Sequence, residues 1–161
     1  MKKPPTKEAL RDELLVILEQ ELVVLEANHQ ATIEGATHEQ AKPENDKDTR
    51  ALEQSYLARG QAQRIETLKA DLSAIKLMPI RNFDAAQAIA LGALVVVEEE
   101  DAERTLWLAP QGGGTQLQGG KVQVVTPGAP LGRALLGKRE GDDLELRLAG
   151  KLKALTVRKV R

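Results

Sequence analysis

Residues 15–25 read Leu-Val-Ile-Leu-Glu-Gln-Glu-Leu-Val-Val-Leu, and this stretch decides the fold. Leu15, Leu18, Leu22 and Leu25 recur at spacings of three, four and three, which is typical of the seam of a coiled coil. Upstream, Pro4 and Pro5 precede a candidate N-cap at Thr6, so the pattern predicts a helix from Thr6 to about Ala27.

A second stretch repeats the same spacing at Ile65, Leu68, Leu72 and Ile75. It predicts a helix that starts near Asp46 or Asp48 and ends at Pro79. The polar segment 28–48 is expected to connect the two helices. Neither helix can bury its stripe alone, so we expect an antiparallel coiled-coil hairpin, a rod on the order of 40 Å long and too thin for a ligand pocket.

The chain after residue 79 changes character and predicts a small α+β domain. Strands are expected at 93–97, 105–109, 122–126, 144–148 and 155–160, and a short helix at 130–136 with Gly137 as its stop. The glycines at 112–114 read as a turn, because the lysine and hydroxyl residue of a phosphate loop do not follow. We therefore divide the chain into a hairpin at 1–79, with an acidic tip near 36–48, and an α+β domain at 80–161.

Composition argues against several classes of protein. Net charge is −1, with −3 on residues 1–79 and +2 on residues 80–161, so neither part predicts a stand-alone nucleic-acid binder. The apolar runs are too short to cross a membrane, and no signal peptide is apparent. The chain has no cysteine. These features predict a cytoplasmic protein without a membrane partner.

Residues that carry chemistry are few. His29 and His38 are nine positions apart in a polar segment, which favours surface histidines over metal ligands, and no enzyme fingerprint is present. Four acids crowd the bend of the hairpin: Glu39, Glu44, Asp46 and Asp48. They indicate either a solvated loop that favours the start of a helix, or an incomplete Mg²⁺ site that a partner completes.

Residues 130–142 read Pro-Leu-Gly-Arg-Ala-Leu-Leu-Gly-Lys-Arg-Glu-Gly-Asp. This run resembles the C-terminal signature of the GreA/GreB family of transcription elongation factors, and Glu44-Asn45, followed by a helix through Tyr56, resembles that family's acidic hairpin tip. The resemblance implies an FK506-binding-protein-like C-terminal domain with an antiparallel sheet. It also implies bacterial RNA polymerase as the partner, with the hairpin passing through its secondary channel so that the polymerase cleaves backtracked RNA.

Under this resemblance the chain is not itself an enzyme. It has no cofactor of its own and no small-molecule substrate, and it meets the 3′ end of nascent RNA only within the polymerase complex. Glu44 and Asp46 would contact Mg²⁺ shared with the polymerase, and Asn45 and Asp48 would act beside them. Polymerase docking falls on part of the C-terminal signature: Leu131, Arg133, Leu135, Leu136 and Lys138. The simpler interpretation of the three leucines is that they belong to the core.

One departure from the family pattern concerns the tip. Family members that promote cleavage carry an acid three residues before the Glu-Asn pair, where this chain has Ala41. Asp46 or Asp48 replaces that acid, or else the protein regulates or inhibits the polymerase without promoting cleavage. Two further alternatives are a coiled-coil adaptor and a prolyl isomerase; Phe83 and Trp107 are too few aromatics for the pocket of the latter.

Overall fold

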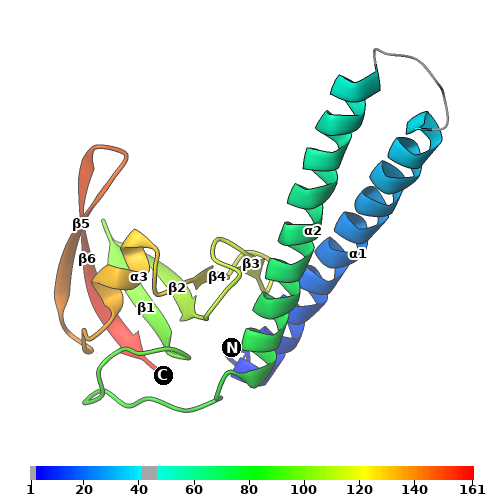
Figure 1. Cartoon of the computed structure of the whole chain (residues 1–161). Helices are drawn as coiled ribbons and strands as arrows, with labels where there is room; N and C mark the ends of the chain where they lie inside the picture. The colour runs from blue at the N-terminus through cyan, green and yellow to red at the C-terminus, as the bar shows by residue number, and fades with distance from the viewer. Residues whose placement is uncertain (1–2, 41–46) are drawn as a thin grey trace. The chain divides into compact units, whose positions relative to one another are not determined.

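The computed structural model describes residues 3–40 and 47–161, with only the backbone described at 36–40, 47 and 48. Two long helices come first, followed by strands and one short helix (Figure 1). The elements are α1 (Lys7–Gln40), α2 (Lys47–Leu77), β1 (Leu94–Glu99), β2 (Ala102–Leu108), β3 (Gln116–Leu117), β4 (Val122–Val125), α3 (Pro130–Leu135), β5 (Asp143–Leu148) and β6 (Lys151–Val160).

Contacts divide the chain into two compact units. The hairpin unit is Val16–Leu72, and the sheet unit combines Met1–Leu15 with Ser73–Arg161. The predicted fold class is confirmed, since two paired N-terminal helices precede a mostly antiparallel sheet that carries a short helix. No described helix has the length and apolar character needed to span a membrane.

In the hairpin unit, α1 and α2 lie side by side and antiparallel (Figure 1). Leu18 of α1 and Ile65, Leu68 and Leu72 of α2 are each 6% exposed, which confirms the apolar stripe predicted for α2. Polar contacts join the helices at the edges of this seam: the Arg64 guanidinium bonds Glu21 at 2.7 Å, Lys69 lies 3.9 Å from Glu26, and His29 Nδ1 lies 3.3 Å from Gln61 Oε1.

The predicted end of α1 at Ala27 was wrong, because the helix continues to Gln40. The apolar stripe thins there while the pairing persists, since the half-buried positions of the facing α2 are small or polar: Ala51, Gln54, Ser55, Ala58, Gln61 and Ala62. Residues 28–40 include strong helix formers, and the single Gly35 costs only about 1 kcal/mol. The predicted seam on α1 is also shifted: Leu10, Leu14 and Leu18 are buried, whereas Leu15, Leu22 and Leu25 are half-buried.

In the sheet unit, the strand order is β3-β4-β2-β1-β6-β5. The predicted strands all form, and two features were not predicted: the two-residue strand β3, and the parallel pairing of β4 with β2. One face of the sheet carries a core in which Leu106 and Leu135 are fully buried, with Leu131 packed against it. The opposite face carries Leu94, Trp107 and Val124, which are partners in the pairing and at most 4% exposed.

The first turns of α1 belong to the sheet unit and are fixed to it by specific contacts. Thr6 caps the helix as predicted, accepting a hydrogen bond from the Ala9 N–H at 3.1 Å. The Glu13 carboxylate accepts hydrogen bonds from the Gln118 backbone N–H at 3.0 Å and from Gln118 Nε2 at 2.6 Å. Leu14 is in contact with Gly112, where an added Cβ would lie 2.9 Å from Leu14 Cδ1.

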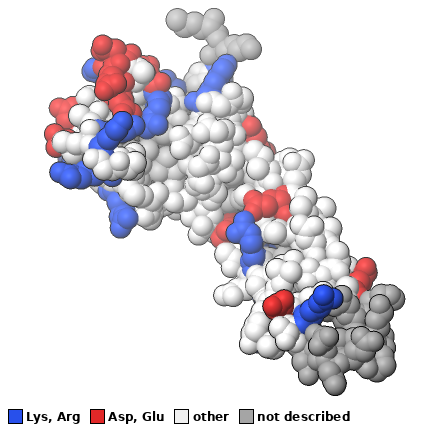
Figure 2. Space-filling view, turned by 90° about the horizontal axis from the view of Figure 1, so that it is seen from above, with Lys and Arg blue, Asp and Glu red and all other residues white. Residues whose placement is uncertain are grey.

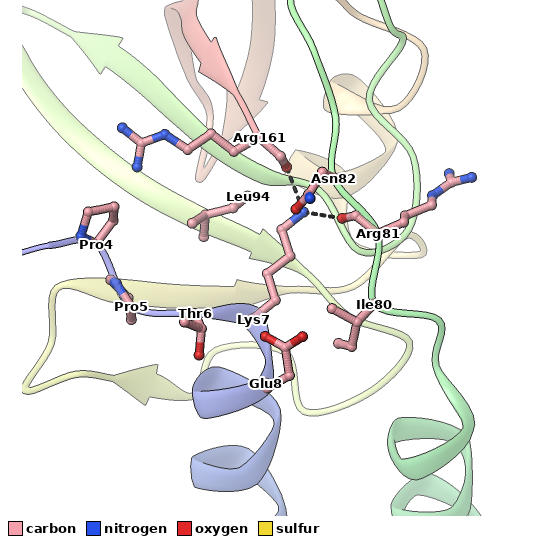
Figure 3. A pocket seen from close by; sticks show the side chains of 10 residues that line it. All are labelled: Pro4, Pro5, Thr6, Lys7, Glu8, Ile80, Arg81, Asn82, Leu94 and Arg161. Carbon is pink, nitrogen blue, oxygen red and sulfur yellow. Dashed lines mark hydrogen bonds between the residues drawn. The ribbon is translucent and has the colours of Figure 1, made fainter.

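Lys7 is a buried cation at the start of α1 (Figure 3). Its ammonium donates to the backbone carbonyls of Arg81 and Arg161, each at 2.7 Å, and lies 4.9 Å from the centre of the Phe83 ring. The pKa of Lys7 is lowered from 10.5 to about 8, mainly by burial and in part by the charge of Arg81, while the charge of Glu8 opposes the shift. Lys7 thus ties α1 to both the connecting segment and the end of β6.

The seam position Leu68 generates a test of the hairpin. Leu68→Ala should lower the free energy of unfolding by about 2–5 kcal/mol, because it removes a buried side chain and leaves a cavity. Leu77→Ala makes the same change on the same helix at a side chain that is 82% exposed, and should cost less than about 0.5 kcal/mol. Urea denaturation measures both; equal losses would contradict the seam.

The buried Lys7 predicts a dependence of stability on pH. Below pH 8 the lysine is protonated in both states; between about 8 and 10.5 the unfolded chain keeps the proton while the folded chain releases it. Because the unfolded state then binds more protons, the contribution of Lys7 to the free energy of unfolding rises with pH across this window. The native chain should therefore gain stability relative to Lys7→Met as pH rises from 8 to 10.5, and a constant difference would refute the prediction.

Candidate functional site

The predicted acidic tip lies at the link between α1 and α2. Helix α1 ends at Gln40 and α2 begins at Lys47, so Ala41, Glu44, Asn45 and Asp46 fall outside the described residues. The backbone of Asp48 lies in the first turn of α2, and its side chain is not described. A carboxylate in the first turn of a helix is stabilised by the helix dipole. Their proposed roles therefore stay predictions.

Within the described residues, no group of three or more histidine, aspartate and glutamate side chains is placed to hold a metal ion. His29 lies beside a groove of about 320 Å³ between the helices, where Lys69 is placed 3.9 Å from Glu26 and 3.8 Å from Glu66. Its ring nitrogen pairs with Gln61 rather than with a carboxylate. This arrangement stabilises the pairing of the helices and brings together no acid, base and nucleophile.

The predicted docking segment lies on α3 and the turn that follows it. Leu135 is fully buried and Leu131 is half-buried, so these two leucines are part of the core. Arg133 is exposed, Leu136 is 37% exposed and Lys138 is half-buried. The accessible part of the predicted surface is therefore Arg133, Leu136 and Lys138.

Backbone contacts hold this segment in place. The Ile89 N–H donates to the Lys138 carbonyl at 2.7 Å, and the Gly137 N–H donates to the Ile89 carbonyl at 2.9 Å. Gly132 is buried against the preceding turn, where a Cβ would clash with the carbonyl oxygen of Thr126. A glycine is thus required for close packing of α3, and the outward side chains project from a fixed backbone.

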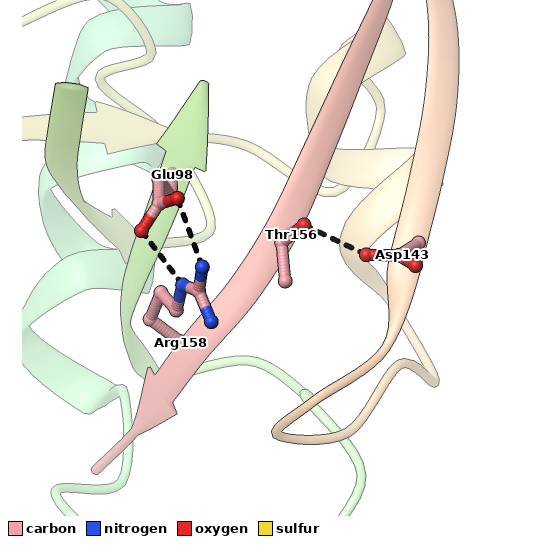
Figure 4. Close-up of polar contacts among 4 residues, drawn as sticks. All are labelled: Glu98, Asp143, Thr156 and Arg158. Atoms are coloured by element: carbon pink, nitrogen blue, oxygen red, sulfur yellow. Dashed lines mark hydrogen bonds and ion pairs between the residues drawn. The ribbon is translucent and has the colours of Figure 1, made fainter. Parts of the chain in front are cut away.

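The exposed part of the sheet carries paired charges (Figure 4). Arg158 donates from Nε and Nη2 to the two carboxylate oxygens of Glu98, at 2.7 and 2.8 Å, and Thr156 donates to Asp143 at 2.7 Å. The hydrogen bond from Arg158 lowers the pKa of Glu98, and the same bond raises the pKa of Arg158. A carboxylate held ionised by a bidentate arginine is suited to bracing adjacent strands and unsuited to acid catalysis.

Two contacts that hold the first turns of α1 within the sheet unit were not predicted from the sequence. Lys7 and Glu13 each bond backbone groups more than 70 residues away in the chain. A single lysine or glutamate in the first turns of a helix gives no signal of such a partner, because charged residues are common at solvated helix positions. Only the long-range packing of the sheet unit identifies them.

Comparison with known proteins gives one curated relative and several similar structures. The chain is 32% identical over 121 residues to transcription elongation factor GreA of Halorhodospira halophila, which covers 75% of this chain and 73% of that protein. No protein-family model matches the chain.

Among solved structures, GreA factor homolog 1 of Thermus thermophilus is similar with a TM-score of 0.40 and 20% identity, covering 91% of this chain and 94% of that one. The factor GreA/GreB from Nitrosomonas europaea is similar with a TM-score of 0.37 and 20% identity, covering 66% of this chain and 88% of that one. The family assignment rests on the curated relative, whose alignment covers three quarters of this chain at 32% identity. The chain belongs to the GreA/GreB family of transcription elongation factors.

Proposed function

We propose that this chain binds bacterial RNA polymerase through the secondary channel and stimulates cleavage of backtracked RNA by the polymerase's own active site. The observation that carries the proposal is the long antiparallel hairpin whose linking segment holds the acids Glu44 and Asp46. With 34 residues in α1 and 31 in α2, each helix is about 45–50 Å long at a rise of 1.5 Å per residue. Such a hairpin reaches deep into a partner while its base stays outside.

The chemistry belongs to the polymerase, and the chain is an accessory factor. Mg²⁺ is commonly held by one or two carboxylates together with phosphate oxygens of the substrate. Glu44 and Asp46 would supply carboxylates to a cation shared with the polymerase. Asn45 and Asp48, which are close to them in the sequence, would act beside them. A second cation activates the attacking water and stabilises charge on the scissile phosphate.

A second candidate function follows from Ala41, which stands where cleaving family members carry an acid. If Asp46 and Asp48 do not replace that acid, the same hairpin occupies the channel without promoting cleavage. The chain is then a regulator or inhibitor of the polymerase. Both candidates share the partner and the site of entry, and they differ only in the chemistry at the tip.

Docking of the sheet unit would use the exposed Arg133 and Leu136 together with the half-buried Lys138. Two basic groups beside a partly exposed leucine suit a partner surface that is acidic around an apolar centre. In Figure 2, charged side chains of both signs gather in separate groups with uncharged surface between them, so a local cluster, and not the net charge of the chain, would select the partner.

The tip chemistry is tested by RNA cleavage in a purified, backtracked polymerase complex at saturating protein. The native chain should accelerate cleavage, and Glu44→Ala should reduce the acceleration by at least about tenfold, as expected for loss of a metal contact. Polymerase binding by Glu44→Ala should be retained. Glu39→Ala is the control on the same acidic cluster.

The outcomes separate the two candidate functions. Binding of the native chain without any acceleration would leave the regulator as the function. Equal losses in Glu39→Ala and Glu44→Ala would indicate an effect of total charge and would remove Glu44 as a specific ligand.

The docking surface is tested by reversing one charge. Arg133→Glu should weaken binding to purified polymerase by about tenfold, because an attractive contact becomes repulsive. Arg147→Glu makes the same substitution at an exposed position on β5 and should leave the affinity within about twofold. Equal weakening by both variants in a binding titration would count against α3 as the docking site.

A further inference from the structure

Each long helix of the hairpin unit carries a row of uncharged side chains on its exposed side. The α1 outer face consists of exposed residues at spacings of three and four: Val16, Gln20, Val23, Ala27 and Ala31. The α2 outer face is built in the same way: Leu52, Tyr56, Gly60, Gln63, Thr67 and Ala70. Charged residues make up 29% of the chain, and the solvated side of an amphipathic helix is where they ordinarily gather.

The apolar members of these faces are strongly exposed. Val16 is 52% exposed, Val23 65%, Leu52 53% and Tyr56 60%. Arg59 lies over one side of the Tyr56 ring, with its guanidinium 5.8 Å from the ring centre. Exposed apolar side chains that recur along one helix face, with no charged residue within the row, are typical of a contact surface.

The two outer faces point in opposite directions. Two residues along a helix differ by about 200° in direction, so the exposed Val16 lies on the opposite side of α1 from the buried Leu18. Tyr56 lies in the same way opposite Gln54, whose Oε1 is buried. Because the seam is between the helices, the outer faces are on the two far sides of the hairpin.

The described part of the hairpin does not require a glycine at position 60. An added Cβ would meet no atom within 4 Å, and glycine destabilises a helix interior relative to alanine. Glycine at an exposed helix position allows another surface to approach the backbone closely. It lies one turn from Tyr56 on the α2 outer face.

We propose that both outer faces are contact surfaces, gripped from opposite sides by the walls of the polymerase channel that the hairpin enters. This inference rests on the proposed function. A flat partner covers one outer face and leaves the other exposed. A second copy of the chain does the same, because a symmetric dimer uses one patch on each subunit. A partner that encloses the hairpin covers both faces at once, and its walls would be uncharged where they meet these rows.

Single glutamate substitutions test the proposal against matched controls. Val23→Glu and Leu52→Glu each place a charge on an outer face and should weaken polymerase binding by about tenfold, since the charge must lose its hydration in the contact. Val24→Glu and Leu57→Glu make the same changes at flanking side chains that are 58% and 54% exposed. These controls should retain affinity within about twofold. The double variant Val23→Glu/Leu52→Glu should lose about a hundredfold, as distant contacts add.

Gly60→Leu is an uncharged probe of the same surface. It should raise the melting temperature, because leucine favours the helix, and it should still weaken polymerase binding by filling the space beside Tyr56. Circular dichroism of every variant shows whether the helices persist.

The outcomes distinguish this inference from the proposed function on which it rests. Failure of the native chain to bind purified polymerase would overturn the proposed function and this inference with it. If the native chain binds, and the face and flank variants weaken binding equally or do not weaken it at all, this inference alone would be overturned. Sedimentation of the native chain as a dimer that Val23→Glu dissociates would assign the α1 outer face to a second copy instead.

Discussion

Neither long helix can bury its apolar stripe without the other, and the rest of the structure depends on that constraint. Most of the stability of a helix in a protein comes from packing its apolar face against a partner. In the hairpin unit this packing is supplied by Leu18, Ile65, Leu68 and Leu72. In the sheet unit, Leu10 and Leu14 of the same helix are fully buried, and Leu14 lies against Gly112. One helix thus contributes buried leucines to both units.

The seam changes character along α2, and the change has a mechanical consequence. From Ile65 to Ile75 the facing positions are large and buried, whereas from Ala51 to Ala62 they are small or polar. Close pairing continues there through side-chain contacts such as His29 with Gln61 at 3.3 Å. Because small and polar contacts contribute less than buried leucine, local opening should need less free energy in this half than near Leu68. Stability is therefore concentrated away from the segment that is proposed to act.

The sequence pattern predicted the elements that have a strict period and missed those that depend on distant partners. The stripe of α2 and the alternation of Leu144 and Leu146 were each sufficient to identify their elements. The end of α1 was misplaced because hydrophobic periodicity fades where small residues face the helix, although pairing continues to Gln40. The parallel pairing of β4 with β2 was also missed, because strand periodicity carries no information about the direction of a neighbour. The tip acids stand out as a cluster in the sequence, the family resemblance suggests a role for them, and that role stays a prediction.

The C-terminal run that carries the family resemblance combines two kinds of constraint, and the structure separates them residue by residue. Gly132 is fixed by steric contact with the carbonyl of Thr126, and Leu135 by burial in the core of the sheet. Substitutions at these two positions would alter docking only by disturbing α3 itself. Arg133 is exposed and Leu136 is partly exposed, so the fold places no comparable demand on either side chain. The run therefore contains residues that the fold requires, Gly132 and Leu135, and exposed residues that are available for the proposed docking, Arg133 and Leu136.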